Sequence, residues 1–247
     1  MKLLEWNIHK MTNNILVKPF IFNRILEQEA DIICLVEYID DIGIKNKLSA
    51  EYWIRESIAG SGNQILIAIS KKIAPNGIEL IRNTEEELCY NFLHVSFVNI
   101  YNKKFSVIGV RMLSPIDAYK QTPPLNEYLS QIKESFICMG DFNIKRNRLS
   151  HWFPKCNMEN LKYNTKEINN SSIVYVEKYT KVIKGFGDVD HVLGSDDLKI
   201  TSEYNWDFIE DDEMYLQKSN IRVGEVWDIK PAYPDHAMVI TEIDVVY

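Results

Sequence analysis

The amino-acid sequence predicts a layered α/β sandwich, in which two mixed β-sheets pack face to face and helices cover their outer faces. Two helix–strand units near the start are followed by a strand-rich middle, and the same order returns in the second half. This order lets each sheet bury one face against the other sheet and its second face under helices. No repeat, low-complexity run or linker interrupts the 247 residues, so we expect one domain over 1–247.

The first half of the chain supplies two helices and four strands. Pro19–Glu29 has apolar residues at helical spacing and a proline suited to a first turn, and Ile42–Ala50 is also predicted to be helical. The expected strands are Met1–Ile8, Asp31–Val36, Tyr52–Ile58 and Asn63–Ser70. The turn signal Gly60-Ser61-Gly62 joins the last two of them.

The second half begins with a predicted hairpin, whose strands Phe92–Ile100 and Phe105–Leu113 flank the tight turn Tyr101–Lys104. We expect a helix after Pro124, one short helix within the polar stretch 144–170, and a long connection over 203–232. The remaining expected strands are Phe136–Met139, Ile173–Tyr179, Val189–Leu193 and Ala237–Val246.

The composition is that of an ordinary globular protein, with 46% hydrophobic and 26% charged residues. No apolar run is long enough to span a membrane, and the first ten residues do not resemble a signal peptide. The four cysteines include no CxxC pair, which disfavours a zinc knuckle. Cys34 and Cys138 lie in apolar runs, so we expect buried free thiols and a cytoplasmic protein. Nothing in the sequence indicates an obligate protein partner.

Charge is distributed unevenly along the chain. The net charge of −7 disfavours tight nonspecific binding to DNA, but residues 144–166 form a basic stretch with one acid, Glu159. Its basic members are Lys145, Arg146, Arg148, Lys155, Lys162 and Lys166. Residues 203–216 form an acidic stretch without Lys or Arg: Glu203, Asp207, Glu210, Asp211, Asp212 and Glu213. Either run is usually a solvated face.

Several predicted strands begin or end at an Asp, Glu, Asn or His side chain. The segments are Leu3–Asn7, Ile32–Glu37, Phe136–Asn143, Gly187–Leu193 and Pro234–His236. Single Asp and Asn residues are common at strand ends because they start turns. The tetrapeptide Gly-Asp-Phe-Asn at 140–143 is more specific, since a given tetrapeptide occurs by chance in such a chain about once in a thousand.

This collection suits the hydrolysis of phosphate esters. Water must attack phosphorus while charge grows on the leaving oxygen, and Mg²⁺ is held by one or two carboxylates and an amide oxygen. A further carboxylate can orient the water, and a positioned histidine can act on the phosphate. The carboxylates would repel the phosphate unless a cation lay among them.

The order of these segments resembles the endonuclease/exonuclease/phosphatase superfamily. The resemblance runs from Trp6-Asn7 through Val36-Glu37, Gly140–Asn143 and Asp190 to Asp235-His236. It implies a four-layer α/β/β/α sandwich and a phosphoesterase that requires Mg²⁺, with Mn²⁺ as a substitute. It also implies that Glu37 is the principal metal ligand, that Asn7 binds the metal or its water, and that Asp235 lies near the metal.

The resemblance also implies catalytic roles. Asp141 would orient or activate the attacking water, and Asn143 would hydrogen-bond the phosphate or support Asp141. His236 would contact the scissile phosphate, while Asp190 would hold its other ring nitrogen. His191, beside Asp190, would support the residues of the site without contacting the substrate itself. We expect His9, His94 and His151 to be structural.

One position departs from the family pattern, which usually has histidine at the end of the strand before Gly-Asp-Phe-Asn. Here Val107–Val110 leads into Arg111. A guanidinium can bind phosphate oxygens through two hydrogen bonds but cannot act as an acid or base at ordinary pH. We expect Arg111 to bind the substrate phosphate; the alternative is an ion pair within the acidic cluster.

The substrate stays open at this point. The basic stretch should emerge beside the site and could follow a nucleic-acid backbone, whereas the acidic stretch would repel a long polyanion. Nucleic acid is therefore the first hypothesis, and a small phosphorylated molecule or a lipid head group is the second. A non-catalytic binding protein on the same scaffold would be expected to have lost Glu37, Asp141 or His236, and none is lost.

Overall fold

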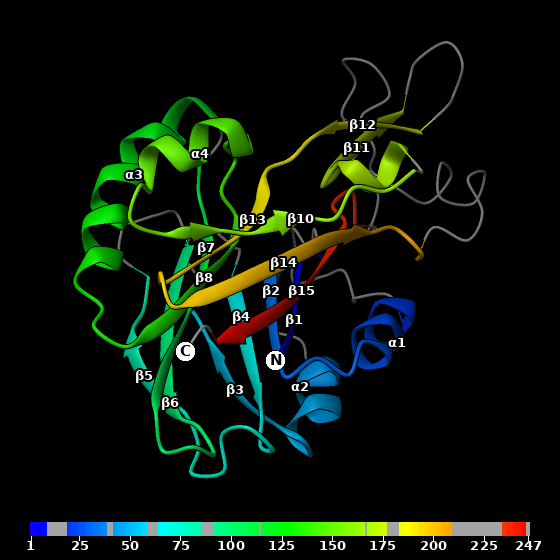
Figure 1. Ribbon diagram of the computed structural model, residues 1–247. Helices are drawn as coiled ribbons and strands as arrows, with labels where there is room; N and C mark the ends of the chain where they lie inside the picture. The colour runs from blue at the N-terminus through cyan, green and yellow to red at the C-terminus, as the bar shows by residue number, and fades with distance from the viewer. Residues whose placement is uncertain are drawn as a thin grey trace.

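The computed structural model describes two β-sheets packed face to face (Figure 1). The described residues are 1–8, 19–38, 42–58, 64–84, 91–113, 115–165, 167–176, 183–208 and 234–245. One sheet has seven strands in the order β10-β14-β15-β1-β2-β4-β3, and the other has six in the order β5-β6-β7-β8-β13-β9. Strands β11 and β12 form a separate two-stranded ribbon.

The strands of the seven-stranded sheet are β1 (Lys2–Asn7), β2 (Ile32–Tyr38), β3 (Tyr52–Glu56), β4 (Gln64–Ser70), β10 (Asn160–Leu161), β14 (Leu198–Asn205) and β15 (Met238–Val245). Those of the six-stranded sheet are β5 (Glu79–Arg82), β6 (Asn91–Val98), β7 (Lys104–Arg111), β8 (Ser135–Asp141), β9 (Asn157–Met158) and β13 (Asp190–Gly194). The ribbon pairs β11 (Ile173–Val176) with β12 (Ile183–Gly187).

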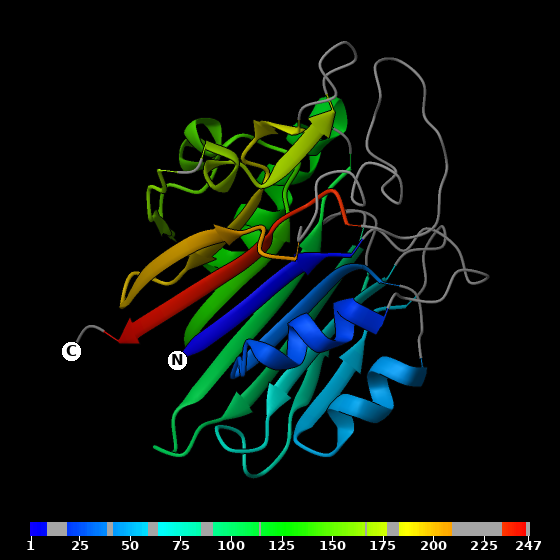
Figure 2. The same ribbon diagram turned by 90° about the vertical axis from the view of Figure 1, so that its right-hand side faces the viewer.

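Helices cover the outer faces of the two sheets. α1 (Pro19–Glu27) and α2 (Ile42–Ser49) lie on the sheet that contains β1 (Figure 2), and their apolar residues join its core. α3 (Pro115–Ser130) and α4 (Arg146–Trp152) pack on the other sheet, and a single 3₁₀ turn (Glu167–Asn170) precedes β11. The predicted four-layer α/β/β/α sandwich is therefore confirmed.

Strand direction brings the polar strand ends together. β1 runs parallel to β2, and β7 runs parallel to β8, so these four strands end at the same edge of the sandwich. β15 and β13 run antiparallel to β1 and β8, with Met238 opposite Trp6 and Asp190 opposite Asp141, and they begin at that edge. One edge thus collects the ends of four strands and the starts of two.

Two sequence expectations were wrong. The predicted helix after Pro124 begins at Pro115 and runs through two prolines. Pro123 lacks the N–H that would bond to the carbonyl of Tyr119, and the hydroxyl of Thr122 donates to that carbonyl instead, over 3.0 Å. The connection predicted over 203–232 also begins too early, because β14 extends to Asn205.

β14 was not predicted because Glu203, at the start of the acidic stretch, obscures its alternation. Every second residue from Leu198 to Tyr204 is buried, as a strand with one covered face requires. The short strands β5, β9, β10 and β12 were also not predicted. Residues 209–233 and the turn Gly60-Ser61-Gly62 lie outside the described residues.

Gly140 is the one glycine on which the geometry of the edge depends. Its φ is 143°, a value that side-chain-bearing residues rarely adopt, and a Cβ there would overlap the carbonyl oxygen of Val110 on the neighbouring strand. The strand therefore approaches β7 closely just before Asp141. This close approach explains a glycine at the first position of the Gly-Asp-Phe-Asn segment.

We predict that Gly140→Ala lowers the free energy of unfolding by about 3 kcal/mol or more, because strain and steric overlap add. Gly77→Ala is the matched control, since Gly77 also has a positive φ, 93°, but no atom lies within 4 Å of its added Cβ. The control should lose only about 1 kcal/mol. Urea unfolding of both variants measures the difference, and equal losses would contradict the proposed overlap.

Candidate active site

The structure gathers the predicted residues at the edge described above, which is the upper end of the molecule in Figure 1. Asn7, Arg111 and Asp141 end their strands there, and Glu37 is the last residue but one of β2. The described members of this group are largely buried; Asn7 and Asp190 are fully so, and Glu37, Asp141 and His236 are 2–6% exposed.

His236 and Asp190 form a buried pair. Nδ1 of His236 lies 2.7 Å from Oδ2 of Asp190, and the indole of Trp6 donates to the backbone carbonyl of His236 over 3.0 Å. Burial alone would lower the pKa of His236, but the charge and hydrogen bond of Asp190, with Asp235 and Asp141 nearby, hold that pKa well above its usual value. The imidazole is therefore cationic at neutral pH, with Nε2 on its other side.

Asp141 is held by two asparagines. The amide Nδ2 of Asn7 lies 3.4 Å from its Oδ2, and the backbone N–H of Asn143 donates to its Oδ1 over 2.9 Å. Asn143 has a left-handed φ of 53° and anchors its own amide to the carbonyl of Met112. Burial and the charge of Asp190 raise the pKa of Asp141 to about 7, although His236 and Arg111 oppose the shift.

Glu37 is bound by Arg111. The Nε and Nη2 atoms of Arg111 both donate to Oε1 of Glu37, over 2.8 and 2.6 Å. Glu37 has a left-handed φ of 49°, which turns the chain sharply at the end of β2. The ion pair that was the alternative for Arg111 is therefore present in the structure.

The donor set fits a hard divalent cation. Oxygen atoms of Asp141 and Asp190 and a ring nitrogen of His236 lie within 4.8 Å of one another, and Oδ1 of Asp190 has no hydrogen-bond partner within the described ranges. The closeness of Asp190 and His236 reflects their own hydrogen bond, which a metal bound to both would break. The oxygen ligands that the sequence resemblance implies are Asn7 and Glu37, with Asp235 further out, its Oδ1 4.0 Å from Nε2 of His236.

Sequence reasoning missed Glu5. It lies two residues before Asn7 on the same face of β1, is fully buried, and neither of its carboxyl oxygens has a hydrogen-bond partner among the described residues. Burial and the charge of Asp190 raise its pKa well above the usual value, which favours the protonated carboxyl. The signal was its placement: a single acid on an otherwise apolar strand, in phase with Asn7.

His191 is the centre of a second buried polar cluster. Its Nδ1 lies 3.1 Å from Oε1 of Glu159, and its Nε2 faces the carbonyls of Ile144 and Asp188 at 2.9 and 3.1 Å. Both ring nitrogens face acceptors, so both must donate and the ring is cationic. Arg146 also donates to the carbonyl of Glu159. His191 thereby ties the segment after Asn143 to the turn before Asp190, a supporting role.

The other histidines lie away from this edge where they are described. His94 is buried and bonds Tyr128 over 2.7 Å, and burial lowers its pKa to about 4. His151 is exposed on α4 beside Trp152. His9 lies outside the described residues.

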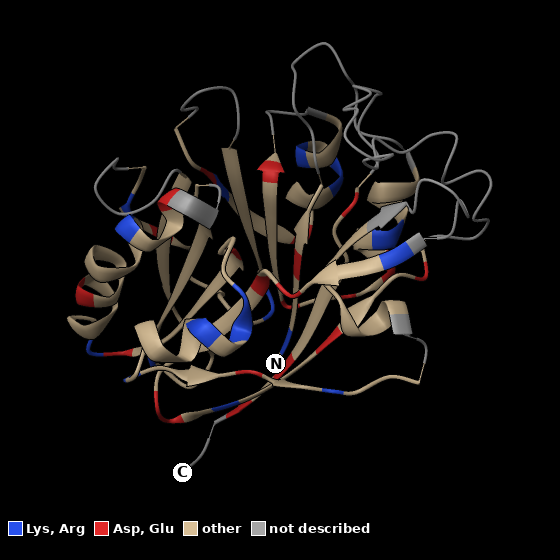
Figure 3. Ribbon diagram, turned by 90° about the horizontal axis from the view of Figure 1, so that it is seen from above, with Lys and Arg blue, Asp and Glu red and all other residues tan. Residues whose placement is uncertain are grey.

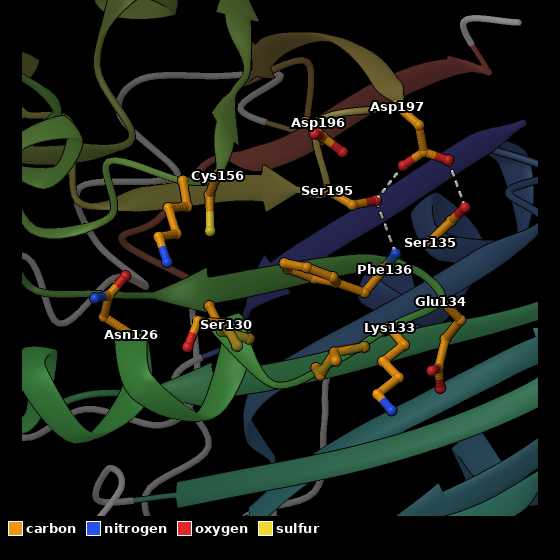
Figure 4. Close-up of a pocket in the computed structure, with 13 residues that line it drawn as sticks. Asn126, Ser130, Lys133, Glu134, Ser135, Phe136, Cys156, Ser195, Asp196 and Asp197 are labelled. Atoms are coloured by element: carbon orange, nitrogen blue, oxygen red, sulfur yellow. Dashed lines mark hydrogen bonds between the residues drawn. The ribbon is translucent and has the colours of Figure 1, made fainter.

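A pocket of about 340 Å³ lies at the opposite end of β8 (Figure 4). Lys155 and Cys156 line it, together with residues from the end of α3. The carboxylate of Asp197 is already bonded by the hydroxyls of Ser135 and Ser195, each at 2.5 Å. No histidine and none of the predicted site residues is among the residues that line this pocket.

Comparison with known proteins supports the fold. No protein-family profile and no curated protein matches the sequence. Among solved structures, truncated TDP2 from Caenorhabditis elegans is 15% identical, with TM-score 0.63 and coverage of 97% of this chain and 96% of that one. ANGEL2, a 2′,3′-cyclic phosphatase, is 10% identical, with TM-score 0.66 and coverage of 100% and 96%.

An endonuclease/exonuclease/phosphatase family protein from Leptotrichia buccalis is 14% identical, with TM-score 0.62 and coverage of 99% of both chains. The chain therefore has the fold of the endonuclease/exonuclease/phosphatase superfamily, as the sequence resemblance implied. Within the described ranges, no helix is both long enough and apolar enough to cross a lipid bilayer.

The raised pKa of Asp141 predicts a pH-dependent stability. The carboxyl holds its proton more tightly in the folded than in the unfolded state, so its ionisation removes stability as pH rises from about 4 to about 7. In metal-free buffer, Asp141→Asn should therefore be more stable than wild type at pH 8, and this advantage should shrink toward pH 4.

Urea unfolding at pH 4.5, 6 and 8, in the presence of a chelator, measures the two stability curves. The exposed Asp244, near the end of β15, supplies the control variant Asp244→Asn, which should run parallel to wild type. A stability difference between Asp141→Asn and wild type that stays constant across this range would contradict the assignment.

Proposed function

We propose that the protein hydrolyses phosphodiesters with the help of Mg²⁺, and that Mn²⁺ can replace it. The observation that carries the proposal is the convergence, from four separate segments of the chain, of the Asp190–His236 pair, Asp141 and Glu37 at one edge of the sandwich. The likeness to the superfamily fold supports the same activity, because ANGEL2, which shares the fold, is a phosphatase.

Each side chain has a role that follows from its surroundings. Glu37 and Asn7, with Asp235 nearby, would hold the cation, which when bound polarises a phosphoryl oxygen and stabilises charge on the leaving group. Asp141, with a pKa of about 7, can accept a proton from water at neutral pH.

His236 is suited to the phosphate rather than to abstracting a proton. Its elevated pKa keeps it cationic, Asp190 fixes its ring, and Nε2 is the donor that can reach a phosphoryl oxygen. Asn143 supports Asp141 through its backbone N–H. Arg111 would bind a second phosphoryl oxygen.

Nucleic acid is the substrate that we propose first, on the basis of the basic stretch 144–166. The structure reduces the number of basic side chains in this stretch that could bind a phosphate backbone. Arg146 is engaged with Glu159, Arg148 donates to the hydroxyl of Tyr119, and Lys155 lines the pocket at the far end. Lys145 is exposed and lies beside Gly187, close to the start of β13, so it is the member suited to a phosphate backbone.

The engagement of Arg146 and Arg148 within the protein also favours the second candidate, a small phosphorylated molecule or a lipid head group. Seen from above, the Lys and Arg segments of the described ribbon lie scattered among Asp and Glu segments (Figure 3). Lys166 and the acidic residues from Glu210 to Glu213 lie outside the described residues. Free thiols at Cys34 and Cys138, both buried, support a reducing and thus cytoplasmic location.

Hydrolysis of bis-p-nitrophenyl phosphate tests the proposed chemistry. We expect a chelator to abolish turnover and Mg²⁺ or Mn²⁺ to restore it, and we expect Asp141→Asn and His236→Ala each to lower kcat by about a hundredfold or more. His151→Ala, an exposed histidine on α4, is the control and should keep wild-type turnover. Full activity in excess chelator would rule the proposal out.

A salt titration of KM separates the two substrate classes. With single-stranded DNA, KM should rise steeply with salt because bound phosphates release counterions, and Lys145→Gln should flatten the slope by about one phosphate contact. Lys155→Gln removes the same charge at the far end and should not change the slope. Weak salt dependence, with identical slopes for all three proteins, would favour the small substrate.

A further inference from the structure

The Arg111–Glu37 ion pair joins the two sheets across the site. Arg111 ends β7 of the six-stranded sheet, and Glu37 belongs to β2 of the seven-stranded sheet. Both donated hydrogen bonds, of 2.8 and 2.6 Å, end on the single oxygen Oε1. The Glu37 side chain is 7% exposed and that of Arg111 is 20% exposed. Charge-assisted bonds in such a shielded position are strong.

This arrangement conflicts with the ligand role of the same carboxylate. Mg²⁺ takes carboxylate oxygens at about 2.0–2.1 Å and keeps a strict geometry. A guanidinium placed on the same carboxylate competes for its charge and repels the incoming cation. A histidine at this position could give up its proton, but arginine stays charged. Cation binding at Glu37 is therefore opposed for as long as the Arg111 guanidinium stays on that carboxylate.

We propose that Arg111 is an exchangeable cation, which neutralises Glu37 while no divalent cation is bound and turns to the phosphate group of the substrate when one binds there. This inference rests on the function proposed above. The planar guanidinium matches two phosphoryl oxygens as well as it matches a carboxylate. Its partial exposure gives it access to solvent at the edge where His236 and Asp141 lie.

The exchange couples two binding events. If cation binding releases Arg111 for the phosphate, phosphate binding must favour the cation by the same factor, because such coupling is reciprocal. Without the guanidinium, the cation would not compete with Arg111 for Glu37, and phosphate binding would lose its dependence on the cation. Arg111 therefore acts as a binding residue whose availability is set at Glu37.

Calorimetric titration of Mn²⁺ into the substrate-free protein tests the competition. Arg111→Gln should bind Mn²⁺ more tightly than wild type, by roughly 5- to 150-fold, the usual range for coupled sites. Arg82→Gln is the matched control, because Arg82 lies in the same sheet as Arg111. Its guanidinium stacks on the ring of Tyr128, 4.9 Å from the ring centroid. Its affinity for Mn²⁺ should equal that of wild type.

Titration of inorganic phosphate, with and without Mn²⁺, tests the second half of the exchange. Wild type should bind phosphate more tightly in the presence of Mn²⁺, and Arg111→Gln should lose most of that gain. Circular dichroism checks that the variants fold. If Arg111→Gln does not fold, Arg111→Lys replaces it. The lysine ammonium lacks the paired donors of the guanidinium on Oε1, so this variant should also bind Mn²⁺ more tightly than wild type.

The outcomes distinguish this inference from the proposed function. Equal or weaker Mn²⁺ binding by the Arg111 variant, with binding lost in Glu37→Gln, would overturn the exchange and leave the metal site in place. Wild-type Mn²⁺ binding by Glu37→Gln would instead overturn the assignment of Glu37 as a ligand, and the exchange with it.

Discussion

Crowding of like charge at one edge of the sandwich is the constraint on which the site depends. Five carboxyl groups meet there: Glu5, Glu37, Asp141, Asp190 and Asp235. The protein relieves their repulsion in three ways. Arg111 neutralises Glu37, the cationic His236 neutralises Asp190, and burial raises the pKa values of Glu5 and Asp141, which favours their protonated forms. A phosphate anion could not enter this edge without further positive charge, which the divalent cation proposed above would supply.

Much of the fold could be predicted from the sequence because its strong signals are local. Apolar runs ending in a polar residue marked β1, β2 and β8, and parallel pairing then places such ends at one edge. Elements without a local signal were not predicted correctly. β14 carries Glu203 inside a strand whose other face is buried, so charge masked its alternation. α3 contains two prolines that normally end a helix, and it continues because Thr122 supplies the missing donor and Leu125 and Leu129 remain buried.

The site was predictable in its residues but not in its pairings. Arg111 and Glu37 are 74 residues apart, and no spacing rule indicates that one bonds the other. Glu159 and His191 form a buried ion pair that only the contact between β9 and β13 creates. In the sequence, Glu5 is a residue of an ordinary strand, and its burial comes from the opposite sheet. Sequence periodicity does not predict which side chains tertiary packing brings together. These same pairings determine the pKa values on which the assigned roles depend.

The basic stretch shows how misleading net charge along a sequence can be. Arg146 belongs to a buried cluster with Glu159 and His191, and that cluster fixes the segment after Asn143 relative to the turn before Asp190. Its charge therefore serves the architecture of the site and offers little to a polyanion. What a phosphate would meet at this edge is a short series of cationic groups, Lys145 at the rim and His236 and Arg111 inside. Since two of the three are held by carboxylates, the affinity of the site for phosphate depends less on how many cations it contains than on how many their carboxylates can release.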